Sequence, residues 1–506
     1  MIKLVIWDLD DTLWRGTLAD GDDVVVFESR AALVRELNAR GVVSSICSKN
    51  NFETAKRKLV ELGLWDEFVF AHIAFTPKAA AIEKIIADMQ LRACDVLFVD
   101  DNALNLEEVR YALPEIQLLD ITQDDADAQL EAVLGGTPMR KSRVEEYRLL
   151  ERKIRDRDVA PGSNEDFLRS CAIKACAPFL MDNLDFTGRI AELINRSNQL
   201  NYTKSRVDSA ELEARIIDVV GYDSWSIFAW DRYGHYGLVG FVMIDRRSQQ
   251  FVHFVFSCRA MHMGLEAYAL AKAREKWPTI DASQWHDRFS QARPDWIEDC
   301  SFHDPDIRSR LIAEQVSGLA PAPALRIMFD CQSGGIAHFS RNRGRIEFDN
   351  NPRLFALRSV WDDGHLGQDY PPLVVYGAGI DYTDPRWAGL APMLDHGVYR
   401  ECVRKLCAFF DAKGIRALIV LPPENAPEQM YRPQMNQTRD RTARFNREWW
   451  MAAAEWKCID IVDLSQADSA DMADVSHYRP RLLVELAETI DDWLEAAEAP
   501  ALGEAA

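Results

Sequence analysis

The sequence has no apolar run that approaches the roughly 20 residues needed to span a bilayer, and it does not begin with a signal peptide. Its ten cysteines stand singly, without a Cys-x-x-Cys pair, which is typical of reduced thiols and lacks zinc-type spacing. Basic residues are outnumbered, with 59 Lys and Arg against 80 Asp and Glu, so the net charge is −21. Nucleic acids and anionic membranes attract clustered Lys and Arg. We therefore expect a cytoplasmic protein that binds neither nucleic acid nor membrane.

The 506 residues exceed what one hydrophobic core holds, so several domains are expected. Short apolar runs alternate with helical stretches in residues 1–135 and again in 322–498, as in parallel sheets covered by helices. Residues 140–315 instead carry alternating runs typical of antiparallel hairpins. We predict a multidomain α/β protein with these three domains, the middle one α+β. The Ala- and Pro-rich segment Gly318–Ala324 is predicted to be a linker that makes the last domain separable.

Carboxylates follow the first predicted strand, Ile2–Trp7, in the stretch "VIWDLDDT". Charged groups at the end of a buried strand are costly unless a metal or a partner neutralises them. The spacing Asp8-x-Asp10-x-Thr12 suits covalent phosphoryl transfer, because one carboxylate can attack phosphorus while the second protonates the leaving oxygen and later activates water. Mg²⁺ would hold the phosphate and reduce the repulsion between anions.

Three later strand ends supply the other groups that this chemistry requires. The stretch "FVDDNALN" offers Asp100 and Asp101 as further metal ligands. Ser48, in "SSICSKNN", offers a hydroxyl for the phosphoryl oxygens, and Lys78, in "TPKAAA", offers a cation on the first turn of a helix. Because the carboxyl ends of parallel strands meet at one edge, these groups are expected to surround Asp8. The predicted metal ligands are Asp8, Asp10, Asp100 and Asp101.

These stretches resemble the motifs of haloacid dehalogenase (HAD) type phosphotransferases. More narrowly, "WDLDDTLWRGTL", "ICSKNN", "PKAAAI" and "FVDDNALNLEEV" resemble the FkbH-like branch, whose members are described as class IIIC phosphatases. Further along, "LINRSNQLNYTKSRV", "DRYGHYGLVG" and "FSCRAMHMGLE" resemble the acetyltransferase-like portion of that branch. The resemblance implies a Rossmannoid parallel sheet, Asp8 as nucleophile, Asp10 as general acid and base, and Asp100 and Asp101 as the source of the metal ligand.

The resemblance also implies an activity beyond the release of phosphate. FkbH-like proteins take a glyceryl unit from 1,3-bisphosphoglycerate, remove phosphate and deliver a glyceryl thioester to the phosphopantetheine arm of an acyl carrier protein. HAD proteins insert large caps near the first motif or between the second and third. Only 35 residues separate Thr12 from Ser48 and 29 separate Ser48 from Lys78, so no large cap fits. An uncapped site needs a macromolecule or a neighbouring domain to exclude water, and a carrier protein meets that need.

Thioester chemistry suits a thiolate acceptor, for which two cysteines are candidates. Cys47 abuts Ser48, and Cys258 precedes Arg259 at the end of a predicted strand. The alternative for each cysteine is a small buried residue. Arg259 and Gly264 lie in "RAMHMG" before a helix, where acetyltransferase-like folds bind a pantetheine pyrophosphate; the alternative is a tight turn with no ligand.

The last domain weakly resembles SGNH (GDSL-like) hydrolases and acyltransferases. "IMFDCQSGG" follows a predicted strand where that family has Gly-Asp-Ser, and "DVSHYRP" supplies Asp474 and His477 before the last helix. The resemblance implies a relay in which Cys331 replaces serine, His477 is the base and Asp474 orients it. Glycine and asparagine positions of the family are not matched, so a degenerate, non-hydrolytic domain is the alternative.

Three functions remain open from the sequence. The first is an Mg²⁺-dependent transferase that loads a carrier protein with an acyl group from a phosphorylated three-carbon acid. The second is an Mg²⁺-dependent phosphatase whose other domains recognise a partner. The third is a non-catalytic binding scaffold, which the complete set of phosphotransferase motifs disfavours.

Overall fold

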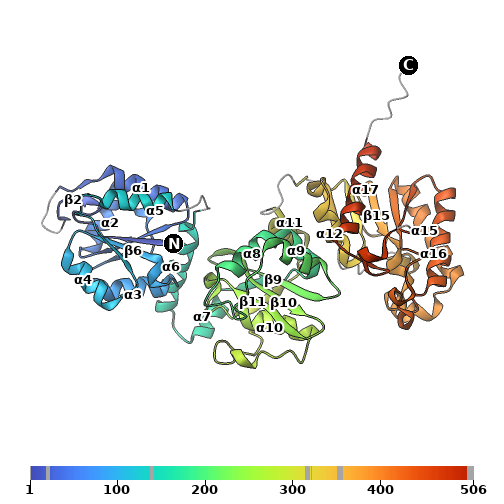
Figure 1. Cartoon of the computed structure of the whole chain (residues 1–506), viewed down its shortest axis with the longest axis horizontal. Helices are drawn as coiled ribbons and strands as arrows, with labels where there is room; N and C mark the ends of the chain where they lie inside the picture. The colour runs from blue at the N-terminus through green and yellow to red at the C-terminus, as the bar shows by residue number, and fades with distance from the viewer. Residues whose placement is uncertain are drawn as a thin grey trace, which may run out of the picture. The chain divides into compact units, whose positions relative to one another are not determined.

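The computed structural model describes residues 2–18, 23–136, 142–313, 319–320, 322–349, 357–465 and 467–498. These residues form an α/β protein of several domains, organised by three five-stranded sheets (Figure 1). The chain divides into two compact units, Met1–Ile173 with Trp230–Tyr236 and Lys174–Ala229 with Gly237–Ala506. No helix in the described part of the chain is both long and apolar enough to cross a bilayer.

The first sheet is parallel throughout, with the strand order β5-β4-β1-β6-β7. In that order its strands are His72–Ile73, Val43–Ser48, Leu4–Trp7, Val96–Asp100 and Gln117–Asp120. The central strand β1 therefore has β4 on one side and β6 on the other. Because all five strands run the same way, the residues that follow β1, β4 and β6 meet at one edge of the sheet.

Helices cover both faces of the first sheet, since neighbouring residues of a strand point to opposite faces. Val5 and Trp7 of β1 pack with helices α1 (Glu28–Ala39), α2 (Phe52–Glu61) and α5 (Ala126–Gly135). Leu4 and Ile6 pack on the opposite face with α3 (Lys78–Asp88), α4 (Ala103–Ala112) and α6 (Val144–Val159). Because these strands are buried on both faces, they appear in the sequence as continuous apolar runs.

The middle sheet has the order β11-β10-β9-β8-β12. In that order its strands are Gln250–Phe256, Gly234–Asp245, Tyr222–Asp231, Ile173–Cys176 and Ile297–Cys300. Strands β10 and β11 pair in the antiparallel sense, as the alternating sequence predicts. The helices of this region are α7 (Asn164–Ser170), α8 (Thr187–Arg196), α9 (Ser209–Ile217), α10 (Leu265–Lys276) and α11 (Pro305–Ala313).

The last sheet is again parallel, with the order β14-β13-β15-β16-β17. In that order its strands are Ile346–Asp349, Leu325–Met328, Leu373–Gly377, Arg416–Leu421 and Ile459–Asp463. One core contains residues of β13, β15, β16 and β17 and of helices α15 (His396–Lys413) and α16 (Arg439–Glu455). Helix α12 (Ser333–Phe339) packs against β13, β14 and α17 (Pro480–Glu498). A short antiparallel pair, β18 (Met472–Asp474) and β19 (His477–Tyr478), lies between β17 and α17 in the chain.

Candidate active site

An acidic cluster lies at the carboxyl edge of the first sheet. Asp8 follows β1, Asp100 ends β6 and Asp101 comes next. One carboxylate oxygen from each lies within 4.8 Å of the others. Asp8 and Asp100 are buried and Asp101 is half-buried. Oxygen ligands of this kind are those that Mg²⁺ prefers, so these three side chains are suited to hold a divalent cation.

Lys78 connects two of these carboxylates. It is the first residue of α3, and its Nζ lies 2.8 Å from Asp8 Oδ1 and 2.6 Å from Asp100 Oδ2. The side chain is only 2% exposed. Burial alone would lower the pKa of Lys78, but the charges of Asp8 and Asp100 outweigh it and raise the pKa. One ammonium faces three carboxylates, which leaves excess negative charge that a divalent cation would neutralise.

The same crowding of charge changes the acidity of the carboxyl groups. Burial raises the pKa of Asp8 to about 6, while Lys78 opposes the rise and Asp100 adds to it. Burial and the charge of Asp100 also raise the pKa of Asp101. Both pKa values are raised because burial and neighbouring negative charges disfavour the ionised carboxylates.

The Asp10 carboxylate is held by three donors beside this cluster. Its Oδ1 accepts hydrogen bonds from Trp14 Nε1 at 2.8 Å and from the backbone N–H of Leu18 at 3.2 Å. Its Oδ2 accepts one from Asn50 Nδ2 at 2.9 Å. Among the described side chains the acidic cluster does not include Asp10. Metal ligation by Asp10 therefore stays a prediction, and the fixed carboxylate suits the predicted role in proton transfer.

Polar side chains on the neighbouring loops hold the carboxylates in place. Ser48 is buried at the end of β4, lowers the pKa of Asp8 against the effect of burial, and accepts a hydrogen bond from Asn50 Nδ2 at 3.2 Å. Asn105 Nδ2 donates to both oxygens of Asp100 at 3.2 and 3.3 Å. No role was predicted for Asn50 or Asn105, although they lie in the motifs "ICSKNN" and "FVDDNALNLEEV".

Two residues predicted near the reacting groups are buried. The Thr12 side chain is fully buried and its Oγ1 has no hydrogen-bond partner among the described residues. Cys47 belongs to the apolar core on the α3 face of the sheet, and burial raises the pKa of its thiol to about 12. A thiol this weakly acidic is a poor nucleophile, so the prediction of Cys47 as an acyl acceptor is wrong and its alternative as a small core residue is correct.

The predicted pantetheine loop precedes α10. Arg259 donates from its backbone N–H and from Nε to Ser257 Oγ, at 3.3 and 3.2 Å. Gly264 has φ of 86°, and a Cβ there would lie 3.1 Å from the Trp296 ring, so the turn itself requires glycine. The side chain of Cys258 lies outside the described residues. The binding roles of Arg259 and Gly264 stay predictions.

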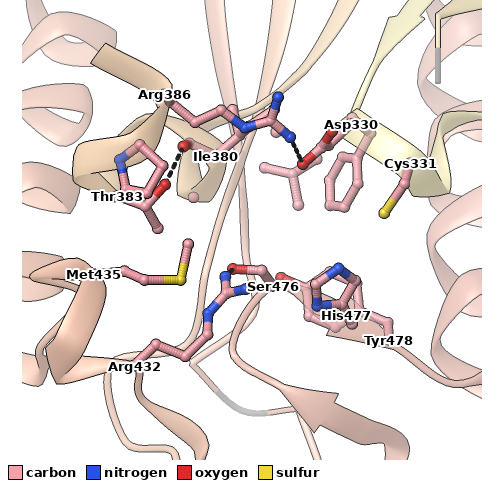
Figure 2. Close-up of a pocket in the computed structure, with 15 residues that line it drawn as sticks. Asp330, Cys331, Ile380, Thr383, Arg386, Arg432, Met435, Ser476, His477 and Tyr478 are labelled. Atoms are coloured by element: carbon pink, nitrogen blue, oxygen red, sulfur yellow. Dashed lines mark hydrogen bonds and ion pairs between the residues drawn. The ribbon is translucent and has the colours of Figure 1, made fainter. Parts of the chain in front are cut away.

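In the last domain the structure brings the predicted relay together. Cys331 follows β13, whereas Asp474 and His477 lie on β18 and β19. His477 Nδ1 lies 2.8 and 2.9 Å from the two Asp474 oxygens, and His477 and Cys331 line the same cavity. Figure 2 shows the Cys331 sulfur and the His477 ring on the same side of a cavity.

No family model matches the chain, and no curated protein matches it. The N-terminal part of protein BF1531 from Bacteroides fragilis, which contains a phosphatase domain complexed with Mg, is similar over 27% of this chain and 41% of its own, with 23% identity and a TM-score of 0.24. The match thus spans about two fifths of that protein's solved chain. A 3-deoxy-D-manno-octulosonate 8-phosphate phosphatase from Moraxella catarrhalis is similar over 27% of this chain and 87% of its own, with 18% identity and a TM-score of 0.21.

A third solved structure, the carbohydrate acetylesterase Est24 from Sinorhizobium meliloti, is similar over 34% of this chain and 99% of its own. The identity is 12% and the TM-score is 0.24. Similarities this low carry no argument about the reaction. The function of the chain is therefore inferred from its own residues.

Proposed function

We propose that the first domain is an Mg²⁺-dependent phosphatase that forms an aspartyl phosphate on Asp8. The observation that carries this proposal is the buried cluster of Asp8, Asp100 and Asp101 around the Lys78 ammonium. The cluster combines a carboxylate nucleophile with fixed positive charge and with ligands for a divalent cation. Positioning and charge stabilisation provide most of the catalysis in phosphoryl transfer.

The reaction has two steps. In the first, an Asp8 oxygen bonds to phosphorus, the bond from phosphorus to the leaving oxygen breaks, and Asp10 gives that oxygen its proton. In the second, Asp10 takes a proton from water while the water oxygen bonds to phosphorus, which releases Asp8 and inorganic phosphate. The hydrogen bonds from Trp14, Leu18 and Asn50 keep the Asp10 carboxylate in one orientation for both proton transfers.

The other groups stabilise charge. Bound Mg²⁺ would neutralise charge on the phosphoryl oxygens and orient them at Asp8, Asp100 and Asp101. Lys78 holds a positive charge beside Asp8, and the Ser48 hydroxyl is positioned by Asn50 to donate to a phosphoryl oxygen. Asn105 keeps Asp100 oriented toward the cluster.

The test uses the full chain and p-nitrophenyl phosphate. Asp8→Asn should lower phosphate release by about three orders of magnitude or more, because an amide is not a competent nucleophile. Asp11→Asn is the matched control, since Asp11 is exposed and adopts a left-handed φ of 50° that Asn also tolerates. EDTA should stop the wild-type reaction and added Mg²⁺ should restore it. Similar rates for a folded Asp8→Asn variant and the control would refute the proposal.

For the substrate we propose a phosphorylated three-carbon acid whose acyl group is delivered as a thioester to an acyl carrier protein. Two observations support a macromolecular partner. Phe75 and Leu104, three residues from Lys78 and Asp101 respectively, are 70% and 79% exposed, so apolar side chains flank the motifs of the site. The resemblance of the motifs to FkbH-like proteins supports the same partner.

Incubation with 1,3-bisphosphoglycerate and a phosphopantetheine-bearing carrier tests this finer proposal. The carrier should gain the mass of one glyceryl group in the presence of Mg²⁺, and Phe75→Ser with Leu104→Ser should slow the loading while leaving p-nitrophenyl phosphate hydrolysis unchanged. Phosphate release without any change in carrier mass would favour the alternative, a phosphatase whose other domains recognise a partner.

A further inference from the structure

The last domain holds a second constellation of reactive groups, which the phosphatase chemistry does not use. Cys331 lies in a short 3₁₀ turn, Asp330–Gln332, at the carboxyl end of β13. His477 and Asp474 come from the β18–β19 pair about 145 residues later in the chain. Ligands of open parallel sheets bind at this end of the strands. The fold therefore places a thiol, an imidazole and a carboxylate at the carboxyl ends of the strands, where a substrate would bind.

Paired hydrogen bonds join the two segments. Gln332 is buried, and its Nε2 donates to the Tyr478 carbonyl while its Oε1 accepts from the Tyr478 N–H, both at 2.7 Å. Gln332 and Tyr478 are the direct neighbours of Cys331 and His477. The two bonds thus fix the thiol-bearing turn against the imidazole-bearing strand.

The backbone before the thiol is strained in a way that is typical of functional turns. Asp330 has a left-handed φ of 60°. Its carboxylate forms an ion pair with Arg386, and its carbonyl accepts a hydrogen bond from Ser333 Oγ at 2.9 Å. These contacts fix a backbone conformation that is unfavourable for most residues other than glycine. The result is a turn that presents Cys331 to the cavity (Figure 2).

The order of contacts is that of a nucleophile, a base and an orienting group. Asp474 engages Nδ1 of His477, and Cys331 shares the lining of one cavity with His477. Burial alone would lower the pKa of His477, but the hydrogen bonds to Asp474 and Cys331 outweigh it and raise the pKa to about 10. Among the described residues, the cluster of His, Cys, Asp and Glu with metal-ligand spacing is the one at Asp8, so proton transfer explains this second set better than metal binding.

The cavity beside the relay limits the size of a substrate. Its volume is about 230 Å³, below the roughly 300–1,000 Å³ of pockets for drug-sized ligands. Apolar Ile380 and Met435 share its wall with the guanidinium groups of Arg386 and Arg432. Figure 2 shows the two guanidinium groups on opposite sides of the space. An acyl group of a few carbons fits this space, whereas a long acyl chain or a polymer does not.

We propose that Cys331, His477 and Asp474 form a second catalytic centre, which accepts a short acyl group from a thioester and passes it to another thiol. His477 takes the Cys331 proton as the sulfur bonds to the carbonyl carbon, and the donor thiol leaves with that proton. The acceptor thiol then gives its proton to His477 and bonds to the carbonyl carbon, and the displaced Cys331 takes that proton from His477. Each step exchanges one thioester for another, so the transfer needs no further source of energy.

The thiol in place of a hydroxyl explains why this centre transfers rather than hydrolyses. A thioester on Cys331 is more reactive toward thiolates than toward water, because a thiolate is the stronger nucleophile at neutral pH. Asp474 acts through His477 and is a positioning residue, whereas Cys331 and His477 touch the reacting atoms.

The experiment uses the full chain with S-acetyl-N-acetylcysteamine as donor and pantetheine as acceptor. Peptide mass spectrometry should find one acetyl group on Cys331 in the absence of pantetheine, and acetyl-pantetheine should form when it is added. Cys331→Ala should reduce both to background, and His477→Ala should lower the rate by about 10²–10⁴-fold. Cys300→Ala is the matched control, since Cys300 is likewise a half-buried free cysteine in this unit of the chain.

A second measurement separates chemistry from folding. Asp474→Asn should slow acetylation more at pH 7 than at pH 9, because hydroxide replaces the base at high pH; a merely structural role would slow it equally at both. Acetylation should proceed equally in EDTA and in Mg²⁺, so that failure of the phosphatase proposal does not affect this one. The proposal is overturned if the wild type is not acetylated on Cys331, or if folded Cys331→Ala and His477→Ala variants form acetyl-pantetheine at the wild-type rate.

Discussion

Replacing Lys78 by methionine removes the positive charge of the phosphoryl site while keeping the length and the apolar body of the side chain. At an effective dielectric constant of about 20, one contact at 2.8 Å contributes about 6 kcal/mol, and Lys78 has two contacts of this kind. The cost of burying the ammonium offsets much of this gain. Loss of one partner of a buried ion pair costs about 3–5 kcal/mol, which is the expected loss of local stability in EDTA.

Hydrogen exchange is the suitable assay, because a multidomain chain has no single free energy of unfolding. Amides of β1 and β6 in Lys78→Met should exchange between about 100-fold and a few thousand-fold faster in EDTA, since 1.4 kcal/mol corresponds to a factor of ten. Mg²⁺ should reverse part of the loss by neutralising the three carboxylates. Lys84→Met is the matched control, because Lys84 lies on the same helix with a largely exposed side chain. Equal exchange in the two variants, with and without Mg²⁺, would refute the reasoning.

Three further outcomes are expected. Asn105→Ala should raise the Mg²⁺ concentration for half-maximal phosphatase activity by about 10–100-fold, because Asn105 orients Asp100; an unchanged titration contradicts this. The folded-state pKa of His477, about 10, lies above its ordinary 6.5, so the stability from its contacts is complete below about pH 6.5 and is lost as the pH rises to about 10; the protection of β18 and β19 amides from hydrogen exchange should fall over this range in the wild type and not in His477→Gln. Arg343→Met should lower the local stability around the pair by about 3–5 kcal/mol in hydrogen exchange and added Asp185→Asn should recover part of it, because the two charges form a mostly buried pair; additive losses would be inconsistent with that pair.

The sequence predicts most of the first domain because its strands are buried on both faces. The predicted strand Ile2–Trp7 contains the observed β1, Leu4–Trp7, and the expected alternation of strands and helices is present in this domain. Helix α6 lies in a highly charged stretch, yet Val144 and Tyr147 place one face of it in the core, with Leu150 and Ile154 packed against them. In the last sheet β14 (Ile346–Asp349) carries little strand signal, because two of its four residues are acidic.

The separation of the last domain was predicted from the Ala- and Pro-rich segment. Residues 314–318 and 321 lie outside the described residues. Within the second unit, however, the mostly buried pair of Arg343 with Asp185 connects the last domain to the middle sheet region. Charged residues far apart in the chain give no sign of such a contact in a single sequence.

The candidate active site around Asp8 was likewise predictable only in part from the sequence. The carboxylates at Asp8 and Asp100 were predictable because acidic residues after consecutive buried strands meet at one sheet edge. Cys47 was misplaced because its orientation at the strand end depends on which face of the sheet it joins, and this face is decided by packing. The roles of Asn50 and Asn105 depend on side-chain direction, and the sequence contains no information on direction beyond the alternation along a strand.

The central claim, phosphoryl transfer through Asp8, is tested most directly by trapping the intermediate. Asp10→Asn should slow the hydrolysis of the aspartyl phosphate by about 10²–10⁴-fold, because the base that activates water is lost. Mass spectrometry of this variant, quenched in acid after mixing with Mg²⁺ and p-nitrophenyl phosphate, should then find one phosphoryl group on the peptide that contains Asp8. Turnover of substrate with no phosphoryl group on Asp8, or with the group on another residue, would contradict the account.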